Sequence, residues 1–113
     1  MLRITLTTTG RRTERRRPVS LYAFPDGDRL VVVGSRGGAA RDPSWAANLR
    51  ANPNASVAQG RRVTDVRATE VAGRERERLW ALVCEAFPLY ATYQRRTKRT
   101  LPLFVLEQVD SPY

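Results

Sequence analysis

The chain has 113 residues and a hydrophobic content of 42%, enough for one core, so we expect residues 1–113 to form a single domain. Twenty basic residues stand against eleven acidic ones, and the formal charge of +9 predicts an anionic partner. With no histidine and one cysteine, Cys84, the composition excludes a Ser-His-Asp or Cys-His catalytic device, a His-ligated metal site and an internal disulfide, and we expect no metal centre.

The first predicted element is a strand over residues 2–8, in which Leu2, Ile4 and Leu6 alternate with polar residues. Residues 10–18 follow as a polar, cationic loop. This strand-like start has no apolar signal core, and no stretch approaches the roughly 20 apolar residues of a membrane span. We therefore expect a cytoplasmic protein.

A β-hairpin is predicted next. Residues 19–24 and 29–35 flank the dipeptide Asp26-Gly27, a pairing typical of tight hairpin turns. The second arm contains four consecutive apolar residues, 30–33, as expected for a strand that is covered on both faces. We predict that it is the central strand.

A flexible glycine-rich loop, residues 34–38, precedes a short helix predicted over residues 43–51. Asp42 is the predicted N-cap and Pro43 the first helical residue, since both types favour these positions. An Asn-Pro pair then ends the helix, because the residue before a proline disfavours helical backbone.

A second hairpin is predicted from residues 55–59 and 63–71, joined by a Gly-Arg turn. Asp65 and Arg67 leave one face of the later strand polar, which places this strand near an edge or lip of the sheet. Apolar residues then recur at helical spacing from residue 74 until Pro88. A second helical segment, residues 90–98, leads into a last strand, residues 103–109.

The predicted order is three strands, a helix, two strands, two helical segments and a closing strand. Six strands this short pair all their edges most easily in a small barrel. We therefore predict an α+β, mainly β fold in which two or three helices pack around a six-stranded barrel. An open α+β sheet is the alternative.

Four motifs follow one another along nearly the whole chain: TTTGRRT from Thr7, GSRGG from Gly34, DPSWAANLRANP from Asp42, and the segment 87–97 before a closing LPLFVLE. In this order the chain resembles the deazaflavin-dependent nitroreductase family, small proteins of actinobacteria that include quinone reductases using reduced coenzyme F420. The resemblance implies a split β-barrel of the FMN-binding type. It also implies hydride transfer from reduced F420, an 8-hydroxy-5-deazaflavin, to a quinone, nitro or activated-alkene acceptor.

The resemblance further implies a groove for the phosphodiester and glutamate tail of this cofactor. Such a groove needs cations and backbone N–H donors, and arginine suits it because its planar fork matches phosphate and carboxylate. An isolated arginine-rich run is more often a solvated loop, so Arg15 and Arg16 stay unassigned. Trp45 is open between a pocket role and packing of its helix. The implied cofactor-binding residues are Arg11, Arg12, Thr13, Arg17, Ser35, Arg36, Gly37, Gly38 and Trp45.

Ser35, Tyr90 and Tyr93 are the catalytic residues that the resemblance implies, as hydroxyls that orient the acceptor or supply a proton. Phe87, Tyr90 and Tyr93 recur three residues apart, which places them on one helical face. An aromatic stripe at this spacing is also typical of a core, and both interpretations stay open.

The chain departs from the family pattern in three places. Glu14 stands where relatives commonly carry glycine, and it puts a carboxylate beside the implied anion site, where it either weakens binding or pairs with a neighbouring arginine. Phe87 replaces a tyrosine of nitro-reducing relatives, so reduction of bulky nitro compounds is not expected to carry over. Relatives usually have a helical segment before the first strand, whereas this sequence begins almost at that strand. We therefore expect that either the gene start or the cover of the ligand pocket differs from that of the relatives.

Other functions fit the same composition. A small basic barrel with exposed aromatics can bind single-stranded nucleic acid, and the same barrel can carry a flavin, deazaflavin or fatty acid without turnover. FMN is the alternative cofactor, since both molecules carry phosphate. We expect a small-molecule acceptor as partner, no nucleic acid and no membrane span; contact with a membrane surface and the choice between monomer and homodimer stay open.

Overall fold

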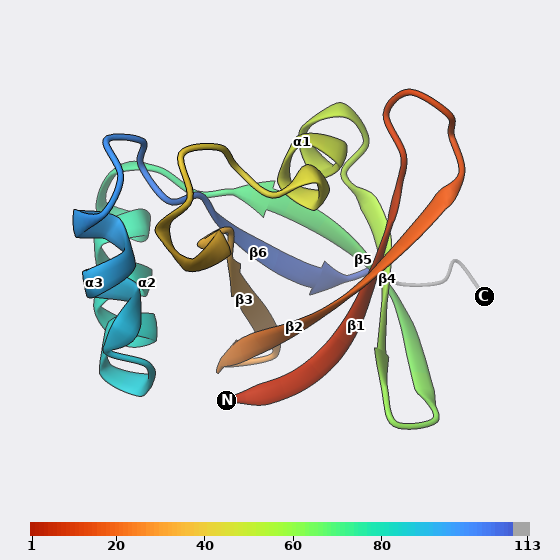
Figure 1. Cartoon of the computed structure of the whole chain (residues 1–113). Coiled ribbons are helices and arrows are strands. Elements are labelled where there is room, and N and C mark those ends of the chain that lie inside the picture. The colour runs from red at the N-terminus through yellow and green to blue at the C-terminus, as the bar shows by residue number, and fades with distance from the viewer. Residues whose placement is uncertain (110–113) are drawn as a thin grey trace.

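The strands of the computed structural model, which describes residues 1–109, form a closed antiparallel barrel in the order β1-β2-β3-β6-β5-β4 (Figure 1). Pairing between β1 and β4 closes the ring, which confirms the predicted barrel over the open sheet. The second strand of the 55–71 hairpin, β5, is bonded on both sides, so its predicted edge position is wrong. The strands are β1 (Leu2–Thr9), β2 (Arg16–Asp26), β3 (Arg29–Val33), β4 (Asn54–Gln59), β5 (Arg62–Glu70) and β6 (Leu103–Gln108).

The helices pack on two sides of the barrel (Figure 1). Helices α2 (Gly73–Ala86) and α3 (Leu89–Arg95) lie side by side near β3 and β6, and α1 (Ser44–Ala51) lies beside the loop that joins β1 to β2. The 34–38 loop contains one 3-10 turn, η1 (Arg36–Gly38). No helix within the described residues is long and apolar enough to cross a membrane.

Asp42 is not the N-cap of α1, contrary to the prediction. Pro43 occupies that position and makes no side-chain capping bond. The Asp42 carboxylate instead accepts hydrogen bonds from Arg50 at 2.8 Å and from Arg99 at 2.6 Å. Two guanidinium groups bind a carboxylate more strongly than a free backbone N–H does, so the long-range contacts prevail over the local cap.

Two hydrophobic clusters explain why β3 is apolar on successive residues. Val32 points into the barrel and joins Ile4, Leu6 and Phe104. Val31 and Val33 point outward and pack with residues of α2 and α3. The prediction of a strand covered on both faces is therefore confirmed, since the barrel interior covers one face and the helices cover the other.

Strand β2 is longer than predicted, and this extension shapes the side of the molecule where the site lies. It begins at Arg16, so Arg17 belongs to a strand and not to the preceding loop. Strand β2 pairs with β1 from Arg16 to Ala23 but with β3 only from Phe24 to Asp26. Beyond these three pairs β2 and β3 diverge, and the barrel is split there.

Candidate functional site

A cavity of about 770 Å³ opens where β2 and β3 diverge. One wall is the β1–β2 loop with the first half of β2, and the other is the end of β3, the loop after it and α1. We call this cavity the groove; it is lined by Gly10, Arg11, Arg12, Thr13, Arg17, Pro18, Val19, Leu21, Val33, Ser35, Arg36, Pro43, Ser44, Trp45 and Asn48. Its volume is in the range of small-molecule and cofactor sites.

The β1–β2 loop has a tight, internally bonded shape. Gly10 N–H donates to the Arg15 carbonyl at 2.7 Å, and Glu14 N–H donates to the Gly10 carbonyl at 2.8 Å. A Cβ on Gly10 would lie 3.1 Å from Thr13 Oγ1, which explains the glycine. Arg17 donates to Thr13 Oγ1 at 3.3 Å, so the threonine helps to orient this guanidinium.

Asn48 anchors this loop to α1. Its side-chain oxygen accepts from the Arg11 backbone N–H at 3.2 Å and from Arg11 Nη1 at 2.9 Å, while its amide donates to Thr8 Oγ1 at 3.2 Å. Asn48 is 4% exposed and Thr8 1% exposed, and buried polar groups need such partners. Sequence reasoning assigned Asn48 no role, although it lies inside the helix motif, because its burial is visible only in the structure.

Four arginines give the groove its positive charge. Arg11, Arg12, Arg17 and Arg36 are all exposed and all line the cavity. Within residues 1–109, none of the four forms an ion pair with a carboxylate, because every ion pair there involves Arg29, Arg50, Arg78 or Arg99. The arginines that the sequence assigned to an anion therefore converge on one cavity and keep their charge available.

Apolar side chains line the rest of the groove. Val19, Leu21 and Val33 come from the two diverging strands, and Trp45 comes from the first turn of α1. Trp45 is 7% exposed and packs edge-to-face on Phe104 with ring centroids 5.8 Å apart. The Trp45 ring therefore packs α1 against the core and also lines the groove, while its contact with a cofactor stays a prediction.

The loop after β3 contributes Ser35 and Arg36 to the lining but not Gly37 and Gly38. Gly38 has φ of +84°, and a Cβ there would lie 2.7 Å from the Tyr93 carbonyl oxygen. Gly38 therefore lies close to α3. It was predicted to lie close to a cofactor, but it does not line the groove, and that contact stays a prediction.

Tyr90 and Tyr93 lie behind this loop and do not line the groove. With Phe87 they form an aromatic cluster whose ring centroids are 4.8 to 6.4 Å apart, although Phe87 is the C-cap of α2 and only the two tyrosines lie in a helix, α3. Tyr90 is 5% exposed and meets Phe24 edge-on at 5.7 Å; burial raises the pKa of its hydroxyl to about 12. Their predicted contact with an acceptor stays a prediction.

The fold and the site together define a split-barrel protein with a cationic groove suited to a flat anionic ligand. The sequence model for the F420H(2)-dependent quinone reductases matches residues 2–108. The F420H(2)-dependent quinone reductase Rv1261c of Mycobacterium tuberculosis is 39% identical over 104 residues, which cover 89% of this chain and 70% of the relative. The chain belongs to the F420H(2)-dependent quinone reductase family.

Solved structures agree with this assignment. An F420-H2 dependent reductase superposes with a TM-score of 0.84 at 40% identity and 93% coverage of both chains. A second structure, described as a domain-swapped dimer, has a TM-score of 0.85 at 40% identity and covers 93% of this chain and 79% of its own. The predicted family, reductase class and split-barrel fold are therefore confirmed.

The residues of the groove fit the cofactor that gives the family its name. A deazaflavin with a phosphodiester and a glutamate tail needs several guanidinium groups beside an apolar slot. Arg11, Arg12 and Arg17 supply the first on one wall, and Leu21, Val33 and Trp45 supply the second.

Proposed function

We propose that this chain uses the groove to hold reduced F420 and passes a hydride from it to a quinone. Family membership supports the reaction class. The observation that carries the assignment to this cavity is the convergence of four arginines, unpaired with any carboxylate of residues 1–109, on a space of about 770 Å³.

The arginines are the binding residues. Arg11 is held in place by Asn48 and Arg17 by Thr13, so these two guanidiniums lose little freedom when they bind an anion. Arg12 and Arg36 reach into the same space from opposite walls. We assign all four to the phosphate and carboxylates of the cofactor.

The apolar lining orients the ring of the cofactor and excludes water from it. When bound, the reduced deazaflavin supplies a hydride, and the quinone becomes a hydroquinone by taking up this hydride and one proton from water. Val33 and Trp45 border the space for the ring, and Ser35, two residues after Val33, is one of three hydroxyl side chains in the lining, with Thr13 and Ser44. We propose that Ser35 donates a hydrogen bond to the quinone oxygen as charge develops on it.

A parallel fluorescence titration with F420 and FMN tests the cofactor. Wild-type protein is expected to bind F420 more tightly than FMN, because the glutamate tail adds carboxylates that the arginines can bind. Arg11→Ala is expected to weaken F420 binding by about tenfold, the equivalent of about 1.4 kcal/mol. Tighter binding of FMN would overturn the cofactor assignment.

A turnover assay tests the reaction. Reduced F420 is mixed with protein and a soluble naphthoquinone, and the return of oxidised F420 fluorescence is followed. We expect catalysis that depends on enzyme concentration and saturates with the quinone. Tight binding of F420 without turnover on any quinone would show a carrier instead of a reductase.

A further inference from the structure

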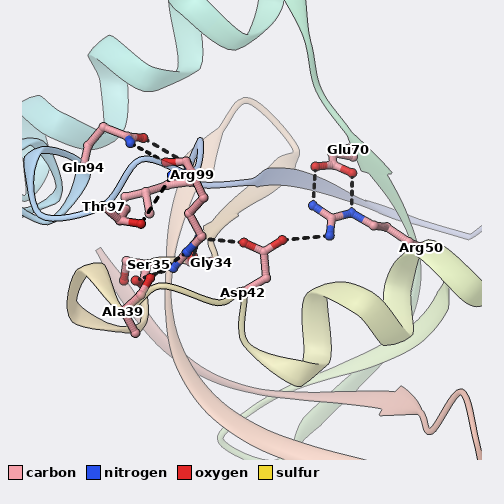
Figure 2. A network of polar contacts seen from close by, with 10 residues as sticks. Gly34, Ser35, Ala39, Asp42, Arg50, Glu70, Gln94, Thr97 and Arg99 are labelled. Carbon is pink, nitrogen blue, oxygen red and sulfur yellow. Dashed lines mark hydrogen bonds and ion pairs between the residues drawn. The ribbon is translucent and has the colours of Figure 1, made fainter.

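The Arg99 side chain donates hydrogen bonds to four residues of the segment that carries Ser35 and Arg36 (Figure 2). Its three guanidinium nitrogens donate to the carbonyls of Ala39 at 2.7 Å, Gly34 at 3.0 Å and Ser35 at 2.9 Å, and to Asp42 Oδ1 at 2.6 Å. The Arg99 side chain is only 14% exposed. Its acceptors all lie on the segment between β3 and α1.

The chain around Arg99 is itself held in place (Figure 2). Gln94 of α3 donates to the Arg99 carbonyl at 2.7 Å and accepts from Leu101 N–H at 2.9 Å. Arg99 N–H donates to Thr97 Oγ1 at 3.3 Å. The guanidinium is therefore presented from a rigid connection and can act as a fixed anchor.

The segment that Arg99 holds needs such an anchor. Arg36 has φ of +44°, a left-handed conformation that costs energy in a residue with a Cβ, and Gly37 and Gly38 continue with φ of +63° and +84°. The C=O and N–H of one peptide point in opposite directions. Binding the carbonyls of Gly34 and Ser35 to Arg99 therefore turns the N–H groups of Ser35 and Arg36 away from it, and both residues line the groove.

Asp42 links this anchor to α1, the other element of the same groove wall (Figure 2). Its second oxygen accepts from Arg50 of α1 at 2.8 Å, and Arg50 in turn makes two parallel bonds of 2.8 Å to Glu70 of β5. The loop after β3 and α1, which carry Ser35, Arg36 and Trp45, are thus held in one charged network.

We propose that Arg99 is a positioning residue for the groove: it keeps Ser35 and Arg36 in the orientation in which they meet cofactor and acceptor, without touching either. This inference rests on the proposed function. Arg99 is absent from the groove lining, so its effect on binding must pass through the segment that it holds.

Arg99→Lys is the informative variant, because lysine keeps the charge beside Asp42 but has no fork that can bridge three carbonyls. Arg78→Lys is the matched control: Arg78 likewise makes several side-chain hydrogen bonds, in its case to the carboxylates of Asp26 and Glu75, but lies outside the groove. Melting temperature, F420 affinity, and kcat and KM with a naphthoquinone are measured for both. We expect Arg99→Lys to be folded and to show a cooperative thermal unfolding transition. Its F420 affinity and its kcat should each fall about tenfold or more, because a small misplacement of a site residue has effects of this size.

Chemical rescue separates positioning from general support of the fold. Added guanidinium ion is expected to restore part of the F420 affinity of Arg99→Ala, and equal concentrations of sodium chloride are expected not to. Arg78→Lys should bind and turn over as the wild type does.

The outcomes separate the two proposals. If wild-type protein binds no deazaflavin, the proposed function fails and this inference fails with it. If the wild type binds and Arg99→Lys binds and turns over equally well, this inference alone is overturned. An equal loss in Arg78→Lys, or failure of both Arg99 variants to fold, would also overturn it, because Arg99 would then serve the fold as a whole.

Discussion

Arginine serves two different purposes at two ends of β2. At the hairpin end, Arg29 and Arg78 share the carboxylates of Asp26 and Glu75 at 2.6 to 3.0 Å, and we call these four residues the hairpin cluster. At the other end lie three of the four arginines that line the groove, Arg11, Arg12 and Arg17, which have no carboxylate partner within residues 1–109.

A count of charged residues is therefore not enough to locate a ligand site. Several surface arginines outside the groove also lack carboxylate partners in the described part of the chain, for example Arg61 and Arg62 on the β4–β5 hairpin. What sets the groove apart is that unpaired guanidiniums converge on one cavity with apolar walls. In the hairpin cluster the same residue type has its electrostatic partners within the fold and connects the hairpin to α2.

The largest contrast is expected between Arg12→Ala and Arg78→Ala. Arg12 makes no side-chain hydrogen bond to any residue of the described chain, so its loss should leave the melting temperature unchanged. F420 affinity should fall about tenfold to a hundredfold, because a charged hydrogen bond contributes about 1.5–3 kcal/mol. Arg78→Ala should show the opposite pattern, a lower melting temperature with unchanged affinity. Equal affinity losses in the two variants would erase the distinction between the regions.

Ser35→Ala and Tyr90→Phe compare two hydroxyls on opposite sides of the loop after β3. Ser35 lines the groove, so Ser35→Ala should lower kcat about tenfold while F420 affinity is retained, as expected for a lost transition-state hydrogen bond. Tyr90 is nearly buried and outside the lining, so Tyr90→Phe should lower kcat by only about two- to threefold. Steady-state kinetics with a naphthoquinone decide the matter. A larger loss in Tyr90→Phe would place the acceptor on the aromatic side of the loop.

Acid should weaken the ion pairs of the hairpin cluster. Hydrogen bonds from Arg78 and Arg29 hold the pKa of Asp26 well below its ordinary value of 3.8. The stabilisation is therefore present above that value and is lost as the pH falls below it toward the lower folded-state pKa. The melting temperature should fall steeply below about pH 4, and Asp26→Asn should make the slope shallower. An unchanged slope in Asp26→Asn would show that the cluster contributes little to stability.

The smallest effect is expected at Glu14, the one carboxylate in the groove loop. Its φ of +57° favours glycine, and no described arginine forms an ion pair with it. Glu14→Gly should keep the melting temperature and tighten F420 binding about two- to threefold, because an exposed charge acts weakly across solvent. Glu14→Gln separates the charge from the backbone strain. Weaker binding in Glu14→Gln would show that the carboxylate supports the loop.

Much of the fold followed from local pattern. The alternation of Leu2, Ile4 and Leu6, the Asp26-Gly27 turn and the apolar run before Gly34 predicted β1 and the first hairpin, because strand pleat and turn backbone depend on neighbouring residues. The wrong assignments, the Asp42 cap and the edge position of β5, share one cause. Both were decided by partners distant in sequence, namely Arg99 for Asp42 and β6 for β5.

Motif order and residue type can be seen along the chain, so they were enough to predict the family, the barrel and the arginines that are expected to bind an anion. The folded structure was needed to see that Arg11, Arg12, Arg17 and Arg36 meet at one cavity, that Asn48 orients Arg11 and that Arg99 holds the Ser35 turn. These contacts join residues 37 and 64 positions apart, and pairing at such distances depends on how the strands close and where β2 leaves β3.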